Sequence, residues 1–415
     1  MRNESQRIQG ADGLRAFACL WVVAHHIAMQ FDVSQTGWQS IIRIHGALGV
    51  AIFFVLSGML LSLPFWQAAL GERSRPKMSS YAMARLSRIV PGYVLCLLIC
   101  TYLFADRTAT TAWRLLTSLT FTNWMHWSTF FPAPINAPLW SISVEICFYL
   151  MLPLWALGLN RIRRIDLGLA YIFGTQLLIV ILQRCFLAFS FASSNTAITS
   201  DPLHAIAINW LPAKNPLGLF AHFLFGSVAA GLLVRWPKRE ADAVRSSRKH
   251  FNKFDLLALA CLLGLAIDVY PEAIPLSGLS RLMNAGHLWY LFYHWPLFPA
   301  LITGLLVALH HSRGIGRLLD NRAFEWTAKL SYGIYLWHMV VLELLLRHWP
   351  VSLAESWLGH VAYVCVAVAI TYSLAAASFY CVEQPVMQWL KRRREAAQAK
   401  PQPSSDRRAT EPGFA

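Results

Sequence analysis

An apolar stretch near the start of the chain carries ionisable side chains at a depth where a membrane-spanning segment normally has none. Residues Asp12 to Phe31 read DGLRAFACLWVVAHHIAMQF. At about 1.5 Å of rise per residue, such a stretch is long enough to cross a bilayer as a helix. Ionisable groups inside a span usually mark a site or a pathway. The stretch therefore constrains both the fold and the function.

Arg15 and His26 are expected to lie on one face of this helix. Eleven helical steps of about 100° leave only about 20° beyond three full turns. Their separation along the axis is about 16 Å, which is close to the length of an extended pantetheine arm. Histidine accepts a proton near neutral pH, so the spacing favours an anion held at Arg15 and chemistry done at His26.

The rest of the chain predicts an all-α, polytopic membrane helix bundle. Of its 415 residues, 56% are hydrophobic and only 14% are charged, which excludes an ordinary soluble protein. Apolar runs of roughly 17 to 25 residues predict about ten transmembrane helices. These runs are Asp12 to Phe31, Gly46 to Phe65, Pro91 to Ala105, Pro138 to Gly158, Leu167 to Phe189, Pro216 to Val234, Phe254 to Tyr270, Ala285 to Leu309, Leu330 to Leu346 and Trp357 to Cys381.

The distribution of positive charge predicts the topology. If the N-terminus is cytoplasmic, 29 of the 36 Lys and Arg residues fall in cytoplasmic segments. This asymmetry satisfies the positive-inside rule with both termini in the cytoplasm. The net charge of +15 is then explained by topology, and no nucleic-acid partner is needed. We expect a multi-pass protein of a bacterial inner membrane, with the lipid bilayer as its surroundings.

The chain is expected to divide into a membrane domain, residues 1–385, and a basic, disordered cytoplasmic tail, residues 386–415. The eight cysteines lie in or at the ends of apolar runs, so we expect neither a disulfide framework nor a metal site. The longest outer segment, Asp106 to Ala137, is rich in aromatic residues. Such a segment forms either an interfacial aromatic belt or a platform on which a sugar ring stacks.

Two arginines lie close together at the cytoplasmic entry of the third expected span, in the stretch YAMARLSRIVPGY. Arg85 and Arg88 are three residues apart and therefore share a helical face. They either anchor the span by the positive-inside rule or bind phosphate, which guanidinium groups hold with two hydrogen bonds. Pro91 fits the first turn of the helix or a kink there.

A carboxylate lies inside the fourth expected span, in PLWSISVEICFYLMLP. Glu145 is predicted at a depth similar to that of His26, and a carboxylate at that depth is costly without a partner. We expect His26 to be this partner, which would give a base oriented by an acid. The alternative is a hydrogen bond to a neighbouring helix or to a substrate hydroxyl.

Taken together, these segments resemble the membrane-bound acyltransferase 3 family. The resemblance rests on DGLRAFACLWVVAHH, GALGVAIFFVLSGMLL, the Arg-x-x-Arg before Pro91, PLWSISVEICFYLMLP, LSYGIYLWHMVV and the closing CVEQPV. These segments occur in the order of the family and cover the chain from about Gln9 to Pro385.

The resemblance implies roles for individual residues. The family's arginine, ten residues, histidine motif matches Arg15 and His26, whereas His25 falls where members commonly have an aromatic residue. His26 is therefore the expected catalytic residue, with Glu145, either as a base in direct transfer or through an acyl-histidine intermediate, and His25 is expected to pack or to support it. Arg15, Arg85 and Arg88 are expected at the donor site. His294 and His338 are expected to pack, and Ser57 is expected to serve close helix packing.

The resemblance also implies a reaction. Family members move an acyl group, most often acetyl, from cytoplasmic acyl-CoA to a hydroxyl of a cell-surface or exported glycan, and no permanently bound cofactor is expected. The alternatives are a small secondary metabolite such as a macrolide as acceptor or, in another class, a transporter or flippase of lipid-linked glycan. Some relatives carry a soluble hydrolase-like domain after the last span. The chain ends about thirty residues beyond that span, so we expect the membrane domain to act alone or with a partner.

Overall fold

The fold was analysed in a computed structural model, which describes residues 8–31, 38–105, 108–133, 136–193, 214–237, 251–269, 294–349 and 356–399. In this part of the chain the regular structure is entirely helical. The longer helices are α1 (Ala11–Gln30), α2 (Trp38–His45), α3 (Leu48–Ala69), α4 (Met78–Phe104), α5 (Ala109–Leu119), α6 (Trp140–Leu159), α7 (Ile165–Ser193), α9 (Pro216–Arg235), α11 (Lys253–Val269), α13 (Leu297–His311), α14 (Ile315–Leu319), α15 (Arg322–His348), α17 (Trp357–Ser378) and α18 (Gln384–Ala399).

The predicted membrane bundle is confirmed. Among the described residues, seven helices are long and apolar enough to cross a membrane: Leu48–Ala69, Met78–Phe104, Ala137–Leu159, Ile165–Gln183, Pro216–Arg235, Arg322–His348 and Trp357–Ala396. The remaining three expected spans correspond to α1, α11 and α13. Helix α1 is continuous, but its apolar sequence contains the polar side chains Arg15, His25 and His26. Helices α11 and α13 have only 17 and 15 residues.

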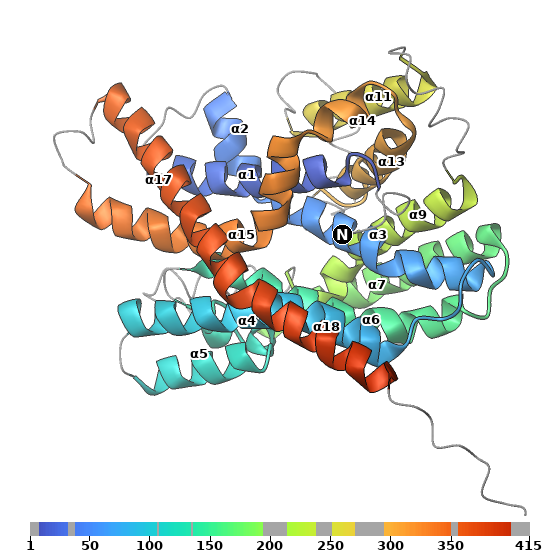
Figure 1. Cartoon of the computed structure of the whole chain (residues 1–415), viewed down its shortest axis with the longest axis horizontal. Coiled ribbons are helices and arrows are strands. Elements are labelled where there is room, and N and C mark those ends of the chain that lie inside the picture. The colour runs from blue at the N-terminus through green and yellow to red at the C-terminus, as the bar shows by residue number, and fades with distance from the viewer. Residues whose placement is uncertain are drawn as a thin grey trace, which may run out of the picture.

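Several expected boundaries were wrong. Helix α4 begins at Met78, so Arg85, Arg88 and Pro91 all lie inside it, and Pro91 is not in its first turn. At the other end of the chain, α17 continues through one π-helical turn (Phe379–Glu383) into α18, which ends at Ala399. Residues 386–399 are therefore helical and not a disordered tail, while 400–415 lie outside the described residues. Figure 1 shows α17 and α18 as one long run that crosses the bundle diagonally.

The outer aromatic segment is partly core. It forms α5 and two 3-10 turns, Asn123–Met125 and Trp127–Thr129. Phe130 and Phe131 are buried, and the Phe130 ring stacks on Trp140 with 5.5 Å between centroids. Trp113 and Trp127 are exposed. The segment is thus neither a uniform belt nor a fully exposed platform, because Phe130 and Phe131 are buried and Phe130 supports the start of α6.

Small residues allow α3 and α9 to pack at short distance in the centre of the bundle (Figure 1). A Cβ added at Gly58 would lie 1.9 Å from the carbonyl oxygen of Phe223, and one added at Gly226 would lie 1.9 Å from that of Val55. Lipid is as apolar as the helix surfaces, so such close contacts replace the hydrophobic effect as the source of packing energy. The indole Nε1–H of Trp66 on α3 also donates to Ser227 Oγ on α9 at 3.1 Å.

Helix α1 lies parallel to α15 with a constant offset in residue number. Cys19 Sγ donates to the carbonyl oxygen of Ser331 at 3.3 Å, and His26 contacts His338, each pair being 312 residues apart. One turn further along both helices, the Tyr363 hydroxyl of α17 contacts Gln30 Oε1 and donates to the carbonyl oxygen of Leu342 at 3.0 Å. The register between α1 and α15 is therefore fixed at three levels.

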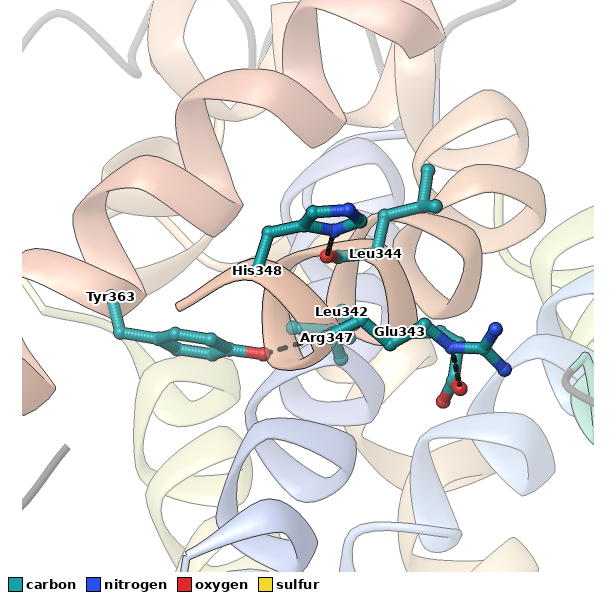
Figure 2. A network of polar contacts seen from close by, with 6 residues as sticks. All are labelled: Leu342, Glu343, Leu344, Arg347, His348 and Tyr363. Atoms are coloured by element: carbon teal, nitrogen blue, oxygen red, sulfur yellow. Dashed lines mark hydrogen bonds and ion pairs between the residues drawn. The ribbon is translucent and has the colours of Figure 1, made fainter. Parts of the chain in front are cut away.

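The carboxyl end of α15 has its own polar contacts, which Figure 2 shows. Arg347 Nε donates to Glu343 Oε1 at 2.8 Å, and His348 Nδ1 lies 2.8 Å from the carbonyl oxygen of Leu344. The first two contacts lie within α15, and the Tyr363 bond to Leu342 joins the end of α15 to α17.

The packing of α3 on α9 predicts opposite effects for two glycine substitutions. Gly58→Ala is expected to destabilise the protein by about 1–3 kcal/mol, because the new methyl group overlaps the backbone of α9. Gly174→Ala on α7 meets nothing within 4 Å and is expected to be neutral or stabilising, by up to about 1 kcal/mol, since alanine favours helix. Thermal unfolding in detergent measures both. Equal midpoints for the two variants would contradict the packing argument.

Candidate active site

A pocket between α1, α3, α4, α6 and α15 brings together four of the five predicted site residues. It encloses about 830 Å³, its open mouth included. The polar side chains that line it are Arg15, Ser57, Arg85, Arg88, Ser141, Glu145, Tyr149, Ser331, Tyr332 and Tyr335. Three helices supply the charged residues, so the pocket exists only when the bundle is assembled.

The charges of the pocket favour an anion. Three guanidinium groups and one carboxylate line it, and all four side chains are partly buried. Guanidinium groups bind phosphate through paired hydrogen bonds, which strengthen where water is excluded. Helix α4 directs Arg85 and Arg88 into the same pocket as Arg15.

Glu145 has hydrogen-bond partners other than the one predicted. Its Oε1 accepts from Ser57 Oγ at 3.0 Å and from the Tyr149 hydroxyl at 2.7 Å. Tyr149 lies one turn further along α6, and Ser57 comes from α3. The predicted His26–Glu145 hydrogen bond is not formed between these two described residues. Similar depth in the membrane was the basis of that prediction, and depth does not determine which way a helix face points.

The partner of His26 is His338. His26 Nδ1 lies 3.2 Å from His338 Nε2 and 2.9 Å from the carbonyl oxygen of Val22, one turn back on α1. The two imidazole centroids are 5.0 Å apart. His338 is fully buried, and its Nδ1 lies 2.7 Å from the carbonyl oxygen of Tyr335. The expectation that His338 only packs missed this contact, although the segment SYGIYLWH already stood out in the sequence.

Tyr335 connects the pocket with the histidine pair. Its side chain lines the pocket, and its hydroxyl is 2.7 Å from Ser141 Oγ and 3.0 Å from the carbonyl oxygen of Pro138. Its own carbonyl group holds the ring of His338, three residues later on α15. The pocket therefore adjoins the His26–His338 pair through Tyr335.

The sequence did not indicate that Lys214 is buried, and it was expected only as one of the seven basic residues in outer segments. Lys214 is almost completely buried just before α9, and its Nζ lies 5.1 Å from the centroid of the Trp140 ring. Burial lowers the pKa of the Lys214 side chain well below its usual value. Nothing in the apolar pattern distinguished Lys214 from a loop lysine, because the helix that buries it is distant in sequence.

A second polar cluster lies apart from the residues of the pocket. His294 Nδ1 is 2.8 Å from Asp268 Oδ2, so His294 has a carboxylate partner and does not only pack. The His45 ring meets the His294 ring edge-on at 5.2 Å. Burial lowers the pKa of His45 to about 4, with a further lowering from His294 that Asp268 opposes. His45 is therefore neutral near pH 7.

Comparison with known proteins gives a consistent family match. The family model described as an acyltransferase domain matches residues 8–376. The chain is 26% identical over 401 residues to the putative peptidoglycan O-acetyltransferase YrhL of Bacillus subtilis, a match that covers 91% of the chain and 55% of YrhL. It is 23% identical to the peptidoglycan O-acetyltransferase OatA of Listeria monocytogenes, with 93% and 56% covered.

Another relative matches over its full length. The acyltransferase MdmB of Streptomyces mycarofaciens is 26% identical over 417 residues, covering 96% of both proteins. The chain thus spans only about half the length of the two peptidoglycan O-acetyltransferases but nearly all of MdmB. No solved structure matches the chain.

The charge of the pocket predicts that it binds phosphate groups. Millimolar inorganic pyrophosphate is expected to raise the unfolding midpoint of the protein in detergent, because a ligand at 100 times its Kd stabilises by about 2.7 kcal/mol. The Arg85→Gln/Arg88→Gln variant is expected to lose this increase. Arg161→Gln/Arg163→Gln, which changes two exposed arginines, serves as the control. An equal increase in both variants would place anion binding outside the pocket.

Proposed function

Because the chain belongs to the acyltransferase 3 family, we propose that it moves an acyl group, acetyl in the first instance, from cytoplasmic acyl-CoA to a hydroxyl of a cell-surface or exported glycan. The observation that supports the donor is the pocket lined by three arginines, of which Arg15 lies on α1 together with His26. We place the protein in the bacterial inner membrane with both termini in the cytoplasm. In this topology the 29 basic residues of the inner segments face the compartment that contains CoA.

In this proposal the phosphates of CoA bind at Arg85 and Arg88, and Arg15 binds further along the donor. Arg15 and His26 are eleven residues apart on α1, which is about 16 Å along the helix axis and within reach of a pantetheine arm. The thioester would then lie in the part of the pocket beside Tyr335. Arg15 either neutralises phosphate or stabilises the oxyanion that forms on the thioester carbonyl.

His26 is proposed as the general base. It takes the proton of the acceptor hydroxyl while the hydroxyl oxygen attacks the thioester carbon. The carbon–sulfur bond then breaks, and the CoA thiolate takes up the proton from the imidazolium. The products are an ester and free CoA, and atoms and charges balance without a metal or redox cofactor in this scheme.

Glu145 remains part of the proposed machinery, but not as the partner of His26. Its Oε1 is held by Ser57 and Tyr149, so the carboxylate is fixed in the wall of the pocket near the three arginines. There it offers an acceptor for polar groups of a substrate and reduces the repulsion between the arginines. Ser57 contributes through this hydrogen bond as well as through helix packing.

A small secondary metabolite such as a macrolide is a second candidate acceptor. The relatives do not choose between the two acceptors, because MdmB, whose match covers 96% of both proteins, is described only as an acyltransferase, while two other relatives are named for peptidoglycan. The flippase alternative is not carried further, because the chain belongs to a family of acyltransferases.

The proposed function predicts loss of glycan acylation when His26 is removed. A gene deletion, and a deletion complemented with His26→Ala at matched membrane abundance, are both expected to lose the alkali-labile acyl signals of the envelope and secreted glycans in proton NMR. A loss of at least about 100-fold in transfer is expected for removal of a general base. Complementation with the intact gene or with His348→Ala, an exposed histidine on α15, restores the signals.

Two outcomes would change the assignment. Unchanged acyl signals in the deletion strain would rule out the glycan and direct the search to small-molecule acceptors. Acyl groups that are lost in the deletion strain but retained with His26→Ala would leave the acyltransferase in place and remove His26 as the base.

A further inference from the structure

The ring of His338 can carry its proton on only one nitrogen when it is neutral. Its Nδ1 lies 2.7 Å from the carbonyl oxygen of Tyr335 and 3.2 Å from that of Ile334. A carbonyl oxygen only accepts hydrogen bonds, so Nδ1 must be the N–H donor. The other nitrogen, Nε2, then presents a lone pair, and it is this atom that faces His26 at 3.2 Å.

The proton of neutral His26 is located by the same argument. Its Nδ1 lies 2.9 Å from the carbonyl oxygen of Val22, which only accepts, and 3.2 Å from the lone pair of His338 Nε2. Both neighbours require an N–H at Nδ1. The lone pair of His26 is therefore on Nε2, which is the only ring nitrogen left to take a proton from a substrate.

The position of the two rings is set by the helices that carry them. Cys19 bonds to Ser331 two turns before the pair. The Tyr363 hydroxyl contacts Gln30 and Leu342 one turn after it, and Figure 2 shows the bond to Leu342. Because the register is fixed on both sides, the His26–His338 contact is part of the packed interface between α1 and α15.

We propose that His338 is a positioning residue that holds His26 in the Nδ1–H tautomer, so that Nε2 of His26 is the base. This inference rests on the proposed function for its catalytic consequence, but its structural content, the location of the proton, stands separately. In Ser-His-Asp triads a carboxylate performs this task and also stabilises the imidazolium. Here a neutral ring sets the tautomer and orientation, and the carboxylate Glu145 is bonded elsewhere.

Two substitutions at position 338 separate the acceptor atom from the bulk of the ring. His338→Gln places an amide near the position of Nε2 and keeps an acceptor for His26. His338→Phe keeps an aromatic ring and removes the acceptor. His348→Phe is the matched control, because His348 makes the same kind of ring contact to the carbonyl oxygen of Leu344 on the same helix but is exposed (Figure 2).

The tautomer is measured directly in the full-length protein labelled with ¹⁵N-histidine, in detergent or nanodiscs. The chain has 14 histidines, so the His26 signals are assigned by their loss in His26→Gln. Long-range proton–nitrogen correlations are expected to show the proton on Nδ1 of His26 in the wild type, in His338→Gln and in His348→Phe. His338→Phe is expected to populate the Nε2–H form as well.

Acetyl-CoA turnover provides the second measurement. His338→Phe is expected to lower kcat by about 10- to 100-fold with little change in KM for acetyl-CoA, because the donor pocket is untouched while the base is misoriented. His338→Gln is expected to remain within about fivefold of wild type, and His348→Phe is expected to be unchanged.

The outcomes distinguish this inference from the proposed function. An Nε2–H form of His26 in the wild type, or an unaltered Nδ1–H form in His338→Phe, would overturn the inference whatever the activity. Equal loss of kcat in His338→Gln and His338→Phe would overturn it as well. Absence of acetyl-CoA turnover in the wild type, with the tautomer as expected, would instead overturn the proposed donor and leave the positioning role of His338 in place.

Discussion

The parallel contact between α1 and α15 is the interaction on which the rest of the site depends. It joins residues 312 positions apart at three successive levels, and the middle level is the His26–His338 pair. Helix α1 also carries Arg15, and α15 also carries Tyr332 and Tyr335, so the same contact forms two walls of the pocket. A shift of one helix by a single residue would separate the imidazoles and displace the arginine. The pairing of His26 with His338 is thus a property of one helix interface.

The cost of burying polar groups explains how the remaining site residues are arranged. A charge or polar group inside a membrane protein is retained only with partners or with access to water. Glu145 has two hydroxyl donors, His338 has two backbone carbonyls, and the three arginines share an open pocket with the carboxylate. These arrangements divide the site into a charged part that suits the phosphates of a donor and a neutral part that suits proton transfer. The proposed donor, acyl-CoA, matches such a division, because it is anionic at one end and reactive at the other.

The outer surface of the bundle has the opposite character. Leucine and other apolar side chains are exposed along α7, α11 and α17, for example Leu177, Leu263 and Ile370. In water such a surface would be a liability, but against lipid it needs no partner. The helices inside this apolar layer are held by close backbone contacts such as those at Gly58 and Gly226. Close packing between the central helices therefore stabilises the bundle, and the surface that faces lipid can be uniformly apolar.

The sequence alone determined the class of fold and the family. The length and hydropathy of the apolar runs predict helices in a membrane. Helical periodicity places Arg15 on one face with His26, and Arg85 on one face with Arg88. Both properties depend only on residues that are near each other in the sequence. The pairing of side chains was decided by the tertiary structure. Glu145 bonds to Ser57 and Tyr149, and His26 meets His338, because the rotation and register of helices far apart in sequence determine which faces meet. The sequence indicates how deep a residue lies in the membrane, which is its position along one axis. A hydrogen bond also depends on the lateral position and rotation of the two helices, which only the tertiary structure determines.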